Sequence, residues 1–140
     1  KKTLAVAESC SGGLLSHRLT NIPGSSEYFK LGIICYSNQS KINLLKVSQA
    51  LLRKYGAVSE QVAISMAKNI RRIDGTDLGL SITGIAGPTG ATKKKPIGLV
   101  FIAVADKRKA FCRQFKFTGK RLSIKQQSTD QALLLLKHFM

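Results

Sequence analysis

The chain of 140 residues is long enough for one domain with its own hydrophobic core and too short for two ordinary ones. Hydrophobic residues make up 44% and the mean hydropathy is +0.00, which excludes disordered and fibrous proteins. No apolar run approaches the ~18 residues that a membrane span needs, and 23 basic against 7 acidic side chains give a net charge of +16. We therefore expect one soluble, cytoplasmic domain over residues 1–140 with no membrane partner.

The first half of the chain predicts two strands and four helical segments. An apolar run predicts the first strand, and a glycine-containing turn leads from it into the first helix. Hydroxyl or amide residues that can cap helices precede the other helical segments. In chain order we predict a strand over 3–8, a helix over about 12–20, a short helical turn from 25 or 26 through 30, a strand over 32–36, a helix capped by Ser37 or Asn38, and a helix from the cap Ser48 through Tyr55.

The second half predicts one long helix, three strands and a terminal helix. Residues 59–73 have the strongest helical spacing, with Val62, Ala63, Met66, Ile70 and Ile73 on the apolar face. Strands are predicted over 78–82, 98–105 and 110–117, the last two as an antiparallel hairpin. Gly119 begins the terminal helix, with an apolar surface formed largely by Leu122, Ala132, Leu133, Leu136 and Phe139.

This element order predicts the fold class. Strands that alternate with helices and end in a hairpin imply a mixed, partly antiparallel sheet covered by helices on both faces. We expect an α/β fold, a three-layer α/β/α sandwich. The chain starts at Lys1 directly before a strand, with no initiator methionine, so we also expect that an N-terminal helix is missing.

Cysteines and histidines are few. Cys10, Cys35 and Cys112 have neither metal-binding nor redox-motif spacing, which predicts a reducing compartment without a disulfide framework. With two histidines and no acidic cluster, we expect no protein-bound metal and no cofactor.

Small and hydroxyl residues gather where strands are predicted to end. Residues 8–13, 23–26 and 83–90 each lie beside an apolar run, and 36–41 brings a phenol, an amide and an amine to the end of another. Because α/β folds bind their ligands at strand ends, these clusters are candidate polar sites.

A serine and a lysine are the candidate catalytic pair. Ser26 lies in a tight turn and could act as a nucleophile, with Lys41 as its base if burial lowers the lysine pKa, and Tyr36 could relay a proton. Taken singly, each residue has a commoner structural role: Ser26 as a helix cap, Lys41 as a solvated lysine and Tyr36 as a core residue. The pair can meet only if the chain folds back along the strand between them, and we expect that it does.

Five motifs together resemble one family. They run in order from about Leu4 to Gly119: Ala-Glu-Ser-Cys-Ser-Gly-Gly (7–13), Pro-Gly-Ser-Ser (23–26), Tyr-Ser-Asn (36–38) with Lys41, Gly-Ala-Val-Ser-Glu (56–60) and Thr-Gly-Ile-Ala-Gly-Pro (83–88). They closely resemble the CinA C-terminal domain family, whose enzymes are nicotinamide mononucleotide deamidases. The resemblance implies hydrolysis of the carboxamide of this nucleotide to nicotinate mononucleotide and ammonia, in pyridine nucleotide recycling, by a homodimer.

The resemblance also implies roles for single residues. Ser26 matches the family's nucleophile, Lys41 its base and Tyr36 the supporting phenol, while Ser9, Thr83 and Arg121 match substrate-site positions. To these we add Ser11, Asn38 and Gly84 as substrate-binding residues. The sequence departs from the family at Ser11, where threonine is frequent, in the loop at 89–91, and at 124–127, where a basic helix start is replaced.

Two other functions stay open. The charge of +16 would suit a non-catalytic, competence- or damage-associated module that binds nucleotides or nucleic acid. Aromatic residues are only 6%, so as a partner nucleic acid ranks behind a small nucleotide. A catalytically lapsed domain that mainly dimerises is the third possibility, against which the intact Ser26, Tyr36 and Lys41 argue.

Overall fold

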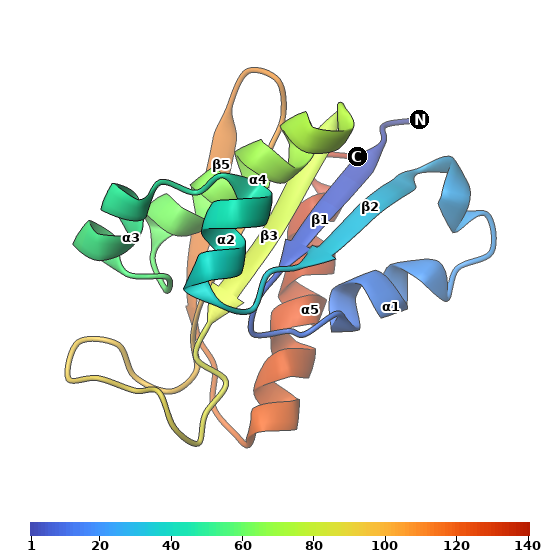
Figure 1. Cartoon of the computed structure of the whole chain (residues 1–140). Helices are drawn as coiled ribbons and strands as arrows, with labels where there is room; N and C mark the ends of the chain where they lie inside the picture. Colours follow the sequence, from blue (N-terminus) through green and yellow to red (C-terminus); the bar gives the residue numbers. More distant parts are fainter.

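Five strands form one mixed sheet in the order β2-β1-β3-β4-β5 (Figure 1). In the computed structural model, which describes all residues 1–140, β1 (Leu4–Glu8) lies between β2 (Phe29–Ile34) and β3 (Leu78–Gly84), parallel to both. β4 (Leu99–Ala105) and β5 (Ala110–Lys116) continue the sheet as antiparallel strands. The predicted mixed sheet and its C-terminal hairpin are confirmed.

Helices cover both faces of this sheet (Figure 1). One face carries two helices, the other carries three, and a short 3-10 turn lies between α1 and β2. The first face has α1 (Leu14–Thr20) and α5 (Arg121–Lys137), the second has α2 (Asn38–Leu45), α3 (Gln49–Tyr55) and α4 (Glu60–Asp74), and the 3-10 turn is Ser25–Glu27. The predicted three-layer α/β/α fold is therefore confirmed. No helix is both long enough and apolar enough to cross a membrane.

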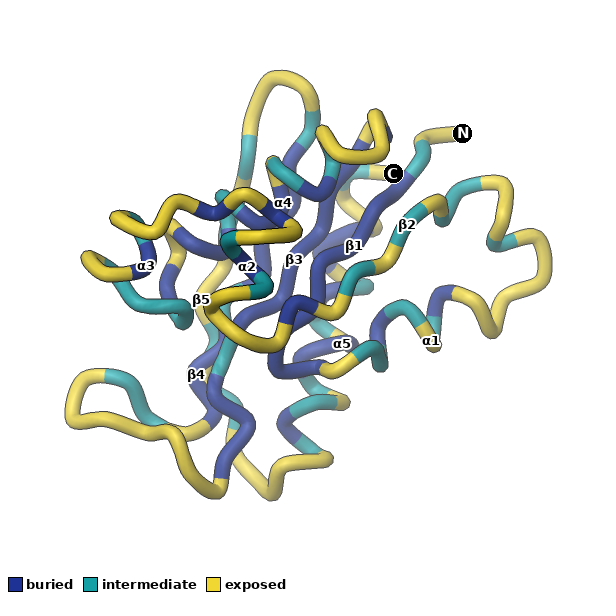
Figure 2. The backbone as a smooth tube through the Cα atoms, in the orientation of Figure 1, coloured by how far each residue is buried: buried dark blue, intermediate teal, exposed yellow.

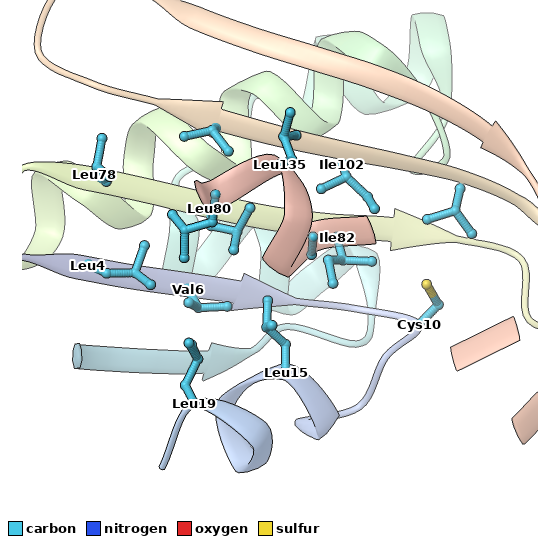
Figure 3. Packing of buried hydrophobic residues seen from close by; sticks show 14 of the residues in the cluster. Leu4, Val6, Cys10, Leu15, Leu19, Leu78, Leu80, Ile82, Ile102 and Leu135 are labelled. Atoms are coloured by element: carbon cyan, nitrogen blue, oxygen red, sulfur yellow. The ribbon is translucent and has the colours of Figure 1, made fainter. Parts of the chain in front are cut away.

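The central strands are buried on both sides (Figure 2). On β1, Leu4 and Val6 join the cluster under α1 and α5, whereas Ala5 and Ala7 join the cluster under α2, α3 and α4. Figure 3 shows Leu15 of α1 and Leu135 of α5 among the side chains of the first cluster. Burial on both faces explains why these strands are continuous apolar runs.

Small residues let α4 lie against β3 and β4 at close range. Ala63 and Ala67 of α4 pack with Ala103 and Ala105 of β4. A Cβ atom placed on Gly79 of β3 would lie 2.0 Å from the backbone oxygen of Ala67. Any larger side chain at this glycine would push the helix away from the sheet.

Serine caps begin the helices of the second face. The hydroxyl oxygens of Ser37, Ser48 and Ser59 accept from the backbone N–H three residues further on, which satisfies a donor that the first helical turn leaves free. The predicted caps Ser37 and Ser48 are confirmed.

Two predictions of local structure were wrong. The helical turn was predicted through residue 30 and the strand over 32–36, but the 3-10 turn ends at Glu27 and β2 spans Phe29–Ile34. Pairing with β1 keeps the first residues of β2 extended, and the segment is too short to form a stable helix by itself. Leu122 and Ile73, predicted on apolar faces, are 72% and 49% exposed. Leu122 lies on the outer side of α5, two residues from the buried Ile124, and Ile73 lies in the last turn of α4.

Candidate functional site

Lys41 and Ser9 meet at the carboxyl edge of the parallel strands. The Nζ atom of Lys41 donates to Ser9 Oγ at 3.0 Å, to the carbonyl of Cys35 at 3.0 Å and to the carbonyl of Tyr36 at 3.2 Å. Ser9 directly follows β1, and Lys41 lies in the first turns of α2, which begins after β2. This is the edge at which α/β sheets bind ligands.

The Lys41 side chain is only 1% exposed. This burial lowers its pKa below the ordinary 10.5, because the charged ammonium is poorly solvated there. Ionised thiolates at Cys35 and Cys10 would raise the lysine pKa, but burial raises the pKa of the Cys35 thiol and raises that of Cys10 to about 12. Both thiols are therefore neutral near pH 7 and supply no negative charge to hold the lysine proton.

A buried carboxylate orders the turn that carries Ser9. Glu8 is fully buried, and its oxygens accept from the Ser11 and Ser16 hydroxyls and from three backbone N–H groups of the turn and α1. A carboxylate at a helix N-terminus is stabilised by the helix dipole. Because Glu8 uses these donors, they are not free to bind a substrate phosphate or an oxyanion.

The first turns of α5 lie over the same turn. Arg121 donates from Nη1 to the carbonyl of Gly87 at 2.6 Å and from Nη2 to the hydroxyl of Tyr36 at 2.8 Å. A Cβ on Gly12 would lie 3.5 Å from the Nζ of Lys125. Two basic side chains of α5 thus lie close in space to the Ser9–Lys41 pair: Arg121 shares Tyr36 with Lys41, and Lys125 lies beside Gly12 in the turn that carries Ser9.

An open hollow of about 670 Å³ lies beside the end of β3. The Thr83 hydroxyl donates to the carbonyl of Ala57 at 2.8 Å, and both Ala57 and Ile85 line the hollow. Lysines and a tyrosine complete much of its wall; they are Lys54, Tyr55, Lys93, Lys94 and Lys95. The hollow combines positive charge with apolar surface.

The 3-10 turn that carries Ser26 precedes β2, whereas α2, which carries Lys41, follows this strand, so the two residues lie at opposite ends of it. Ser26 precedes β2 in the 3-10 turn, whereas Lys41 contacts the residues that follow this strand. Six strand residues separate the two ends, which amounts to ~20 Å at ~3.3 Å per residue. The prediction that the chain folds back to pair Ser26 with Lys41 is therefore wrong within one chain, because β2 is extended.

Sequence comparison decides the family. The family model of the CinA C-terminal domain matches residues 1–140. The chain belongs to this family.

Curated and solved relatives agree with this assignment. A putative competence-damage inducible protein of Moorella thermoacetica is 52% identical over 96% of this chain and 32% of its own length, and a CinA-like protein of Syntrophus aciditrophicus is 51% identical over 100% and 34%. The chain thus spans about a third of the length of these relatives. Crystal structures of a CinA superfamily protein from Escherichia coli (31% identity, 99% of this chain and 81% of that one) and of the competence/damage inducible protein CihA from Agrobacterium tumefaciens (33%, 98% and 84%) each superpose with a TM-score of 0.95.

The candidate site differs in part from the predicted one. Lys41, Ser9, Tyr36 and Arg121 are linked by direct contacts at one edge of the sheet. Ser11 is fully buried, and its hydroxyl donates to Glu8 at 2.7 Å, so its predicted contact with substrate stays a prediction.

Three other predicted residues lie near that edge without touching the pair. Asn38 is exposed at the start of α2, Thr83 is 1% exposed, and Gly84 is packed between β3 and β4, where a Cβ would meet Val100 at 2.6 Å. Their binding roles also stay predictions.

Sequence reasoning missed Glu8 as an organiser of the site. Its signal was present, since Glu8 is the one charged residue in the run 3–8, which otherwise reads as a buried strand. A lone carboxylate beside a buried strand and a glycine turn indicates internal hydrogen bonding.

Proposed function

We propose that the domain hydrolyses the carboxamide of nicotinamide mononucleotide to nicotinate mononucleotide and ammonia. The observation that carries the proposal is the buried Lys41 amine, 3.0 Å from the hydroxyl of Ser9. A lysine whose pKa is lowered by burial can serve as the base for a serine nucleophile. The family resemblance supplies the substrate.

The reaction would pass through an acyl-enzyme. Neutral Lys41 accepts the proton of Ser9 Oγ as this oxygen attacks the carboxamide carbon. When the C–N bond breaks, the Lys41 ammonium returns the proton to the leaving nitrogen, which departs as ammonia. Water, deprotonated by Lys41, then attacks the ester, and Ser9 recovers its proton as the carboxylic acid leaves.

Charge near the pair suits a nucleotide substrate. Arg121 and Lys125 on α5 can neutralise a phosphate, and a guanidinium binds phosphate through two hydrogen bonds. Ser9 is only 7% exposed, so substrate entry requires that side chains around it move. The hydrogen bond between Arg121 and Tyr36 is exposed and can open while Ile124, which is 1% exposed, keeps α5 packed on the sheet.

Ser26 keeps a possible role only through a second copy of the chain. The family resemblance implies a homodimer, and a partner's Ser26 would then have to reach the carboxyl edge of this sheet. Within one chain the geometry favours Ser9 as the nucleophile.

A pair of serine variants tests the proposal. We expect Ser9→Ala and Lys41→Met to lose ammonia release from nicotinamide mononucleotide by roughly 10³-fold or more. Ser26→Ala should keep most of the activity, because its hydroxyl is far from the amine. Initial rates measure the effect, and circular dichroism checks that each variant is folded.

The opposite pattern would reject Ser9. If Ser26→Ala abolishes turnover and Ser9→Ala leaves it near the wild-type rate, Ser9 is a structural acceptor for Lys41. If the unmodified chain releases no ammonia from this nucleotide, from nicotinamide or from glutamine, the hydrolase proposal fails and the binding-module alternative gains support.

A further inference from the structure

Seven basic side chains line two adjoining hollows at the end of the molecule opposite the candidate site. One hollow, of about 110 Å³, is lined by charged side chains alone: Lys68, Arg71, Arg72, Asp106, Lys107, Arg108 and Lys109. The other, of about 690 Å³, shares Arg71, Asp106, Lys107 and Arg108 with it and adds Lys2 and Asp77. We call the two together the basic cleft.

The basic cleft lies where β3 begins and where β4 turns into β5. Ala105, at the end of β4, pairs with Gly79 near the start of β3, so the turn 106–109 lies at the amino end of β3. In Figure 1 this turn and the end of α4 are at the top, and the end of β3 is at the bottom. Ser9 follows the opposite end of the neighbouring parallel strand β1.

Seven basic side chains face only two acidic ones in the basic cleft, Asp106 and Asp77, and none of the seven forms an ion pair. The two ion pairs of the protein are Lys1 with Glu27 and Arg18 with Asp130, both elsewhere. Asp106 accepts from the backbone N–H groups of residues 108 and 109, at 2.7 and 2.8 Å, and so shapes the turn. The second acid of the cleft, at position 77, accepts from the backbone N–H and the hydroxyl of residue 3.

The α4 dipole explains only part of the basic cleft. Arg71 and Arg72 lie in the last turn of α4, where cations are favourable, and Arg71 also donates to the carbonyl of Thr76 at 3.0 Å. Lys107 and Lys109 lie in an exposed turn with no helix end to compensate. Seven basic side chains crowded beside two acidic ones repel one another and attract an anion.

We propose that the basic cleft binds a chain of linked phosphate groups, with linear polyphosphate as the ligand. Several cations spread over α4 and the turn 106–109 match a row of linked phosphates better than they match a single phosphate. The lining contains a single hydrophobic residue, Leu78, and no aromatic ring, so nothing is available to stack on nucleobases. The recognition is of phosphate charge alone.

Matched charge variants test this site. Lys107→Gln/Lys109→Gln removes two charges from the basic cleft, and Lys93→Gln/Lys94→Gln removes two from the exposed loop before β4. We expect wild-type protein to bind linear polyphosphate with an affinity that falls with salt. The first pair should weaken binding roughly tenfold. It should also reduce the slope of log affinity against log salt concentration by about 1 to 2, the equivalent of one or two lost phosphate contacts, while the control pair should change both little.

Other probes identify the ligand, and turnover gives an independent reading. Inorganic phosphate should bind far more weakly than polyphosphate, and single-stranded DNA should compete poorly, because the basic cleft has no aromatic ring on which its bases could stack. Lys107→Gln/Lys109→Gln should leave ammonia release unchanged, because the basic cleft and the Ser9–Lys41 pair lie at opposite ends of the sheet. The binding result stands whether or not the proposed hydrolase activity is found.

Three outcomes would overturn the proposal. The first is no binding of polyphosphate at low salt. The second is an equal loss in both variant pairs, which would mean that net charge alone attracts the ligand. The third is tighter binding of inorganic phosphate or single-stranded DNA than of polyphosphate.

Discussion

At the scale of single residues, the protonation of Lys41 links structure to activity. Burial lowers its pKa below 10.5, so this amine loses its proton at a lower pH than an exposed lysine does. Activity that needs the neutral amine should rise with pH, and the midpoint of that rise should lie below 10.5. Rates of ammonia release measured against pH, with kcat and kcat/KM determined separately, check this expectation.

Lys41→Arg is the control for this pH profile. A guanidinium stays charged at every accessible pH, so the variant should be inactive throughout and should show no shifted midpoint. A wild-type profile that rises only at or above 10.5, or an active arginine variant, would show that Lys41 is not the base.

At the scale of elements, most helices and strands follow from local signals. The spacing of apolar residues in α4 and the serine caps of α2 and α3 predict these helices correctly. β2 was misplaced because Phe29, Leu31 and Ile33 alternate as in a strand while Ser25 or Ser26 before them can cap a helix, and the pairing of Phe29 with Leu4 decides for the strand. Strand ends set by pairing are not visible in the segment itself.

The contact between α4 and β3 allows a direct test of packing. Gly79→Ala should lower the free energy of unfolding by about 3 kcal/mol or more, because its Cβ would lie 2.0 Å from the Ala67 carbonyl oxygen and α4 would have to move. Urea denaturation measures the change.

Gly75→Ala is the comparison for this packing test. Gly75 has a φ of 68° and no atom within 4 Å of an added Cβ, so only backbone strain of about 1–2 kcal/mol is expected there. A cost for Gly79→Ala no greater than that for Gly75→Ala would mean that α4 adjusts easily.

At the scale of the whole molecule, the positions of Ser9 and Ser26 determine whether a site would be formed within one chain or by two chains of a dimer. Ser9 and Lys41 are in contact within one chain. Mixing Ser9→Ala with Lys41→Arg protein, under conditions that exchange subunits, should therefore restore no ammonia release. Differently tagged chains would show that mixed dimers form.

The companion mixture of Ser26→Ala with Lys41→Arg separates the two serines. If Ser26 acted on the partner's Lys41, half of the dimers would be mixed and each would keep one intact site, so about a quarter of the wild-type activity would return. We expect no such recovery. If no dimers form, Ser26 cannot reach Lys41 at all.

The sequence by itself determined the fold class, nearly all of the elements, and the set of polar residues gathered near the carboxyl edge of the sheet. These depend on periodicity, caps and turns, which act over a few residues. It could not decide which hydroxyl meets Lys41, since Ser9 and Lys41 are 32 residues apart and the contact depends on how β1 and β2 align. Two parallel neighbours bring Ser9 and Lys41 to the same edge of the sheet, while the extended β2 carries Ser26 to the other end. The tertiary structure alone also buried Lys41, whose place in a polar run predicts a solvated side chain, because burial depends on what packs around the amine.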